Sequence, residues 1–78
     1  MKEQYKVRQI IEFMLGRIKF FIAEKGYGYI RVEATFEEFF FKQKELKYIV
    51  KKGDRVSFDL KENRHGLYAV NITPIFEE

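Results

Sequence analysis

Two tyrosines in this sequence have the spacing that a stacking surface needs. Tyr27 and Tyr29 lie on either side of Gly28, and Lys25 comes shortly before them. Side chains two residues apart on a β-strand project from the same face, so these rings would lie side by side. Aromatic rings offer flat surfaces on which nucleic-acid bases stack, and a neighbouring lysine attracts phosphate. The spacing therefore indicates a surface suited to single-stranded nucleic acid.

A second aromatic stretch follows at residues 38–42, which read E-F-F-F-K. In a strand, Phe39 and Phe41 share one side, and Phe40 and Lys42 share the other. A barrel needs apolar residues inside, so Phe39 and Phe41 are the expected core pair. Phe40 then points outward beside Lys42. If this strand pairs with the tyrosine strand, the outward rings form one platform edged with lysine.

Short strands separated by turns would position these rings. The sequence predicts strands over residues 17–22, 26–33, 38–43, 54–61 and 67–73. Turn signals lie at residues 24–26, 52–54 and 62–66. Pro74 ends the last strand, because proline cannot donate to a ladder. Five short strands at this spacing predict an all-β fold, a small closed barrel.

The alternation of apolar and polar residues predicts which side of each strand is buried. Val56, Phe58 and Leu60 alternate with polar residues, and we expect all three in the core. Ile30 and Val32 claim the inner side of the second strand. The two tyrosines of that strand therefore point outward.

The bulk composition limits the classes of protein to consider. The chain has 78 residues and a formal net charge of +3, and 18% of its residues are aromatic. This length predicts one domain with a small core, so we expect some rings on the surface. There is no cysteine, which fits a reducing cytoplasm. No apolar run reaches the length of a membrane span, so we expect no membrane partner.

The residues that enzymes use are scarce here. The sequence holds one histidine, and its one serine, Ser57, falls within a predicted strand. It contains no phosphate-binding glycine loop and no metal-ligand spacing. We therefore expect no catalytic activity, no cofactor and no metal.

The first fifteen residues differ from the rest of the chain. Val7, Ile10, Ile11 and Met14 recur at helical spacing, so residues 1–15 form either a short amphipathic helix or an extension that leads into the first strand. We divide the chain into this extension, a barrel over residues 16–75 and an acidic tail over residues 76–78. The apolar stripe would pack on its own barrel, on a second copy or on another partner.

The motifs together resemble the bacterial cold-shock proteins, from about Gly16 to Thr73. The stretch G-R-I-K-F-F-I-A-E-K-G-Y-G-Y-I is similar to the opening of that family, and it contains the first RNA-binding motif with Tyr in place of Phe. E-F-F-F-K resembles the second motif, with Lys42 where the family has histidine. K-G-D-R-V-S-F and G-L-Y-A-V-N-I-T resemble its fourth and fifth strands. The resemblance implies a five-stranded antiparallel OB-type barrel and binding of single-stranded RNA or DNA with low specificity, like an RNA chaperone.

The resemblance also implies which residues would contact nucleic acid. By position they are Lys19, Phe20, Phe21, Lys25, Tyr27, Tyr29, Phe40 and Lys42, with Arg17 and Tyr48 as further candidates. Phe20 replaces the family's tryptophan, and Gln43 replaces a family aromatic residue. Strict alternation would turn Phe20 inward with Ile18, so its exposure requires a bulge or a strand end near Phe21.

A different class of function fits the same barrel. The aromatic face or the N-terminal segment would then be an interface in a small protein-interaction module that self-associates or docks a partner. The missing tryptophan and the extension leave this alternative open.

Overall fold

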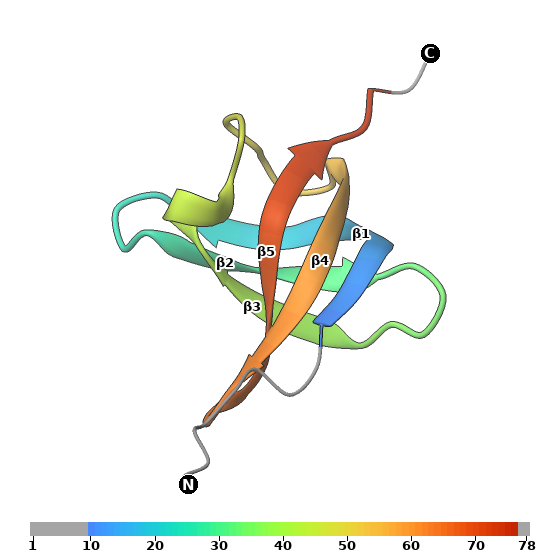
Figure 1. Ribbon diagram of the computed structural model, residues 1–78. Coiled ribbons are helices and arrows are strands. Elements are labelled where there is room, and N and C mark those ends of the chain that lie inside the picture. The colour runs from blue at the N-terminus through green and yellow to red at the C-terminus, as the bar shows by residue number, and fades with distance from the viewer. Residues whose placement is uncertain (1–9, 77–78) are drawn as a thin grey trace, which may run out of the picture.

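Five strands form one antiparallel sheet in the computed structural model, which describes residues 10–76 (Figure 1). They are β1 (Ile10–Ile22), β2 (Tyr27–Val32), β3 (Glu38–Lys42), β4 (Arg55–Asn63) and β5 (Gly66–Pro74), and a 3-10 helix, η1 (Gln43–Glu45), follows β3. The order in the sheet is β3-β2-β1-β4-β5. Between residues 10 and 76 no helix is long and apolar enough to cross a membrane. The five predicted strands are confirmed and β5 ends at Pro74 as expected, but β1 begins at Ile10 and not at residue 17.

β1 is the long central strand around which the sheet curls. Its first part, from Ile10 to Arg17, pairs with β4, and its second part, from Gly16 to Ile22, pairs with β2 (Figure 1). This curl brings β3 and β5 together, and an isolated bridge joins Leu46 to Ile72. The predicted OB-type fold is confirmed. The barrel is not strictly closed, because an isolated bridge and not a continuous ladder of hydrogen bonds joins the chain after β3 to β5.

The prediction of an N-terminal helix is wrong for residues 10–15, which belong to strand β1. Ile11 and Met14, two members of the expected helical stripe, lie in the extended strand β1. Their partners on β4 are Leu60 and Phe58, so three steps along β1 match two steps along β4. The extra residue forms a bulge, and Phe13 adopts φ 61° there. The rest of the expected extension, residues 1–9, lies outside the described residues, as do residues 77–78.

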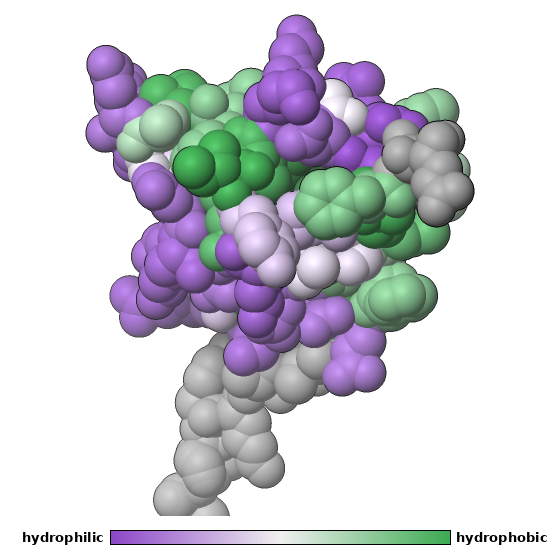
Figure 2. All heavy atoms as spheres, turned by 90° about the horizontal axis from the view of Figure 1, so that it is seen from above, coloured by the Kyte–Doolittle hydropathy of each residue, from purple (hydrophilic) through white to green (hydrophobic). Residues whose placement is uncertain are grey.

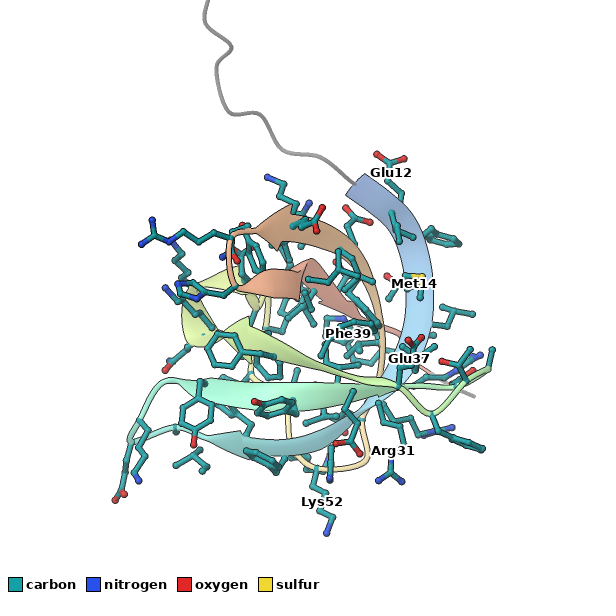
Figure 3. All side chains as sticks on the ribbon, turned by 90° about the horizontal axis from the view of Figure 1, so that it is seen from below. Glu12, Met14, Arg31, Glu37, Phe39 and Lys52 are labelled. Carbon is teal, nitrogen blue, oxygen red and sulfur yellow. The ribbon has the colours of Figure 1, made fainter. Side chains whose placement is uncertain are left out.

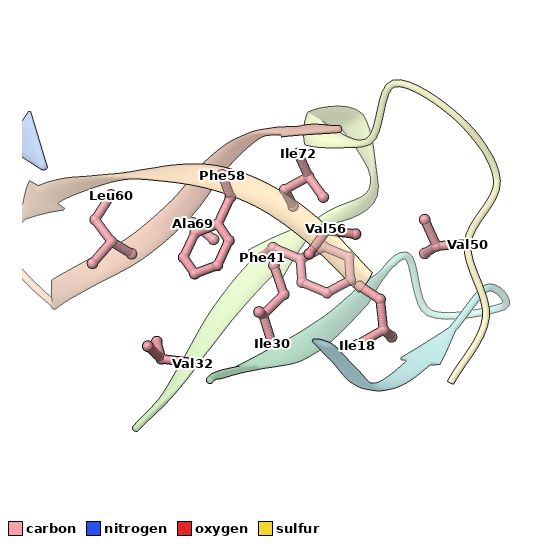
Figure 4. Close-up of a cluster of buried hydrophobic side chains, with 10 residues drawn as sticks. All are labelled: Ile18, Ile30, Val32, Phe41, Val50, Val56, Phe58, Leu60, Ala69 and Ile72. Atoms are coloured by element: carbon pink, nitrogen blue, oxygen red, sulfur yellow. The ribbon is translucent and has the colours of Figure 1, made fainter. Parts of the chain in front are cut away.

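The expected core positions of β2 and β4 are buried. Ile30 and Val56 are fully buried, and Val32 is 3% exposed. Phe41 is fully buried, whereas Phe39 is half-buried against the same cluster. Figure 4 shows these side chains converging between the strands: Ile18, Ile30, Val32, Phe41, Val50, Val56, Phe58, Leu60, Ala69 and Ile72. Among residues 10–76 the inner face of the sheet therefore provides most of the hydrophobic core, and Val50 from the segment before β4 completes it.

Gly28 allows β1, β2 and β3 to approach closely. A Cβ atom there would overlap the carbonyl oxygen of Phe20 and lie 2.7 Å from the ring of Phe41. Gly28 is buried on the inner side, so its small size serves the packing of the core ring.

Candidate functional site

Four aromatic rings meet on the outer face of β1, β2 and β3. The pairing register places Phe40 beside Tyr29 and Tyr29 beside Phe20. The ring centroids of Phe20 and Tyr29 are 5.4 Å apart, and those of Tyr29 and Phe40 are 5.9 Å apart. Tyr27 lies 5.7 Å from Phe40 and 6.2 Å from Phe20. We call these four residues the aromatic platform.

A second bulge in β1 turns Phe20 outward. Ile18 pairs with Ile30, but Phe20 pairs with Tyr29, so Lys19 is an extra residue on β1. The extra residue reverses the alternation, and Ile18 and Phe20 therefore point to opposite sides. This is the bulge that an outward Phe20 requires, and it lies one residue before Phe20.

Lysines border one end of the platform. Lys42 pairs with Tyr27 across β2 and β3, and its side chain is exposed. Lys25 is exposed in the tight turn that joins β1 to β2. Gly26 adopts φ 75° in that turn, and its carbonyl oxygen accepts a 2.9 Å hydrogen bond from the backbone N–H of Gln43. The turn that carries Lys25 is thus fastened to the residue that follows Lys42 at the end of β3.

The other end of the platform carries an ion-pair cluster. Lys19 and Arg31 each lie 2.9 Å from Glu38, one on each carboxylate oxygen. The hydrogen bond from Lys19, followed by that from Arg31, holds the pKa of Glu38 below its ordinary value. Two cations share one anion, so this end keeps a net positive charge. Arg17 pairs with Arg31 in the sheet and donates a hydrogen bond of 3.0 Å to the Gly53 carbonyl oxygen.

Phe21 lies apart from the platform. It pairs with Gly28, and its ring stacks on the core ring of Phe41 at 5.9 Å. Phe21 also lines a separate hollow of about 250 Å³ together with the exposed Tyr48 and with Gln43. The structure thus brings two predicted contact residues together at the Lys42 end of β3. Their role in binding remains a prediction.

Two residues next to the platform did not emerge from the sequence. Tyr68 and His65 line a hollow of about 390 Å³ that also contains Phe40 and Lys42. They come from β5 and from the turn before it, and curling of the sheet carries them to β3. No local pattern in the sequence marks them, because the proximity depends on the closure of the sheet.

Apolar side chains also reach the surface beyond the platform. Phe36 is 71% exposed and Ile49 is 94% exposed. On the face viewed in Figure 2, green apolar side chains gather in patches that purple hydrophilic side chains border. Exposed apolar patches bordered by charge are typical of binding surfaces.

Comparison with known proteins shows which family the sequence of this chain resembles. Residues 14–75 match the model described as the "'Cold-shock' DNA-binding domain". The "Major cold shock protein" of Streptococcus pyogenes serotype M18 is 38% identical over 63 residues, which cover 77% of this chain and 94% of that protein. "Cold shock-like protein CspB" of Bacillus cereus is 34% identical over 65 residues, which cover 80% of this chain and 100% of that protein.

Proposed function

This chain belongs to the cold-shock domain family, and we propose that it binds single-stranded RNA or DNA with low sequence specificity across the aromatic platform. Nucleic-acid binding is the activity of the family. The observation that carries the finer proposal is the contact of four aromatic rings on a face that the core does not use. We take the role to be binding without catalysis.

Stacking accounts for both the affinity and the low specificity of the proposed binding. Every base has a flat π-face, and stacking on an aromatic residue contributes about 1–3 kcal/mol per base. Because this contact does not read the edges of the base, it tolerates any sequence. A duplex keeps its bases stacked inside, so it offers the platform no free base. The protein would thus keep strands from pairing, as an RNA chaperone does, without an energy source such as nucleotide hydrolysis.

Charge would hold the backbone of the bound strand. Lys42 and Lys25 at one end of the platform, and Lys19 at the other, lie where phosphates would pass on either side of the stacked bases. Phosphate contacts release counterions, so we expect binding to weaken as salt rises.

The first experiment compares ligands. Fluorescence anisotropy with labelled oligo-dT, oligo-U and a DNA duplex of equal charge, at low and moderate salt, measures the dissociation constant of each. We expect micromolar or tighter binding to both single strands and much weaker binding to the duplex. Equal affinity for all three ligands would mean that charge alone acts. No binding would favour the protein-interaction alternative.

The second experiment removes one ring. Tyr27→Ala should weaken oligo-dT binding by about 1–3 kcal/mol, because one base loses its stacking partner. Phe13→Ala is the matched control, since Phe13 is 76% exposed and contributes no ring to the platform. Equal binding by the parent and the Tyr27 variant would contradict the platform.

A further inference from the structure

A larger hollow opens beside the ion-pair end of the platform. Its volume is about 800 Å³, within the range of about 300–1,000 Å³ that is usual for ligand pockets. Phe20 lines both the platform and this hollow, so the two surfaces are continuous. The other lining residues come from β1, β2, the loop after β2, the turn at Gly53 and the first residue of β4. The cold-shock motifs in this sequence do not include that loop.

Phe36 supplies an aromatic ring to the rim of this hollow. Its φ is 66°, a left-handed value that is unfavourable for a bulky residue, and its side chain is 71% exposed. Two backbone hydrogen bonds fix it: Phe36 N–H donates to the Val32 carbonyl oxygen at 2.9 Å, and Val32 N–H donates to the Glu37 carbonyl oxygen at 2.8 Å. The loop is also tied down nearby, because Arg55 donates hydrogen bonds of 2.6 Å and 3.0 Å to Glu33. These bonds fix the backbone that carries the ring, and the ring lies on the surface outside the core cluster.

Positive charge surrounds that ring. The lining contains five basic residues and one acidic residue: Arg17, Lys19, Arg31, Lys52 and Arg55, with Glu33. Figure 3 shows Arg31 and Lys52 projecting on the same side of the molecule. Within the described residues, the Lys52 side chain has no ion-pair or hydrogen-bond partner. An exposed ring among cations provides a base-stacking surface together with a site for phosphate.

We propose that this hollow binds one further nucleotide of the same single strand, beyond Phe20, with its base against Phe36 and its phosphate near Lys52. The inference rests on the proposed function, because the strand reaches the hollow by crossing the platform. A nucleotide fits better than an apolar peptide, because the five cations attract a phosphate, whereas an apolar partner would take them out of water without neutralising them. The site therefore lengthens the path of the strand beyond the residues that the cold-shock motifs mark.

The test is a length series. The dissociation constants of oligo-dT from about 4 to about 12 nucleotides, lengths within the span of about 4–16 nucleotides for sites on OB folds, are measured by anisotropy for the parent and for Phe36→Ala. The parent should gain affinity when the oligonucleotide becomes long enough to reach the hollow. Phe36→Ala should bind the shortest ligands as the parent does, and it should bind the longer ones about fivefold or more weakly.

Phe13→Ala is a closely matched control for this variant. Phe13 is also a phenylalanine with positive φ, 61°, and it is also largely exposed, but it lines none of the three hollows described above. It should follow the parent at every length. A Phe36 variant that keeps the full gain with length would overturn the proposal. A Phe36 variant that loses the same factor at every length would overturn it too, because Phe36 would then act on the platform itself.

A charge variant tests the phosphate separately. Lys52→Ala should reduce the slope of log K against log salt by about 0.7 for long oligonucleotides and leave it unchanged for short ones. Lys61→Ala, on β4, should leave both slopes unchanged. If Lys52→Ala leaves the salt slope for long oligonucleotides unchanged, the proposed phosphate contact in the hollow is wrong. If the parent binds no oligonucleotide of any length, the proposed function fails and this inference fails with it. Failure of the inference alone leaves strong binding of short ligands intact.

Discussion

The two halves of the sheet differ on their outer faces and agree on their inner faces. Outside, β1, β2 and β3 carry four rings in contact and the cations around them. β4 and β5 carry polar partners there, such as Ser57 opposite Thr73 and Asp59 bonded to Asn71. Inside, both halves contribute buried apolar residues to one core cluster. Polar outer residues are thus compatible with a strand of this sheet, so the fold does not require the outer rings of β1, β2 and β3.

We expect the largest loss of oligo-dT affinity when the aromatic half receives outer residues like those of the polar half. A variant with Tyr29→Thr and Phe40→Thr keeps residues that favour strands but removes the middle of the platform. We expect oligo-dT affinity to fall by at least about 2 kcal/mol, because two stacking partners are lost. Loss of the cross-strand aromatic pairs should cost stability by only about 1 kcal/mol. Anisotropy and thermal unfolding measure the two effects.

The matched control for that variant lies on the other half. Replacing both Ser57 and Thr73 by Ala changes an outer pair of β4 and β5 and should leave affinity as it is. If the threonine variant binds oligo-dT as tightly as the parent does, the rings are not a binding surface.

A smaller effect should appear in stability when the polar half is altered. Asp59 accepts a hydrogen bond of 2.9 Å from the Phe13 N–H and one of 3.0 Å from the Asn71 side chain. Phe13 lies in the first bulge of β1, and Asn71 lies in a bulge of β5, since Ser57 pairs with Thr73 but Asp59 pairs with Val70. Their φ values are 61° and 51°, so Asp59 holds two bulges in place. Asp59→Ala should lower the free energy of unfolding by about 1–2 kcal/mol, with oligonucleotide affinity unchanged. Denaturant unfolding and anisotropy check the two parts.

The effect of Asp59 should depend on pH. The backbone hydrogen bond from Phe13, followed by the bond from Asn71, lowers the pKa of Asp59 below its ordinary value of 3.8. A lowered pKa gives stability that is fully present above 3.8 and is lost as pH falls through the folded-state value. The stability difference between the parent and Asp59→Ala should therefore shrink in acid. A difference that stays constant from neutral pH into acid would contradict this account.

The strand pattern of the sequence predicted most of this contrast. Alternation placed Val56, Phe58 and Leu60 inside, and the structure buries all three. It also turned Tyr29 and Phe40 outward, where their rings meet. These predictions succeeded because they depend on the two-residue period of a regular strand.

The sequence failed where the strands are irregular. The bulge before Met14 puts Ile11 and Met14 on neighbouring inward positions three residues apart, which is also the spacing of a helix face. A period count cannot distinguish the two structures, so the sequence indicated a helix as one alternative. Phe36 and Tyr68 were missed for another reason. They join the aromatic half through a loop conformation and through the closure of the sheet, and neither leaves a local pattern.

The smallest change in affinity that we expect comes from the negative charge of Glu38 beside the platform. Glu38 binds both Lys19 and Arg31, and its lowered pKa means that it is fully ionised at neutral pH. Glu38→Gln removes this negative charge and leaves both cations available to phosphates. Oligo-dT should bind about two- to threefold more tightly, and the salt slope should become steeper by about 0.7 for each additional phosphate that these cations neutralise.

Glu62→Gln is the control for this charge change, since Glu62 lies on β4 in the polar half. An equal increase in affinity from both variants would mean that total charge, and not the position of Glu38, sets the affinity.

The bulge at Lys19 is a position in β1 where one residue can be lost without exchanging the inner and outer faces of the strand. Ile18 and Phe20 would keep their opposite sides if the codon for Lys19 were lost, because the strand would then alternate regularly through the same pairs. Loss or gain of one codon between Met14 and Ile18 would instead exchange inside and outside for the residues on one side of the change. Natural relatives that differ by one residue within this strand should therefore differ at its bulges, and elsewhere in β1 they should keep the same length.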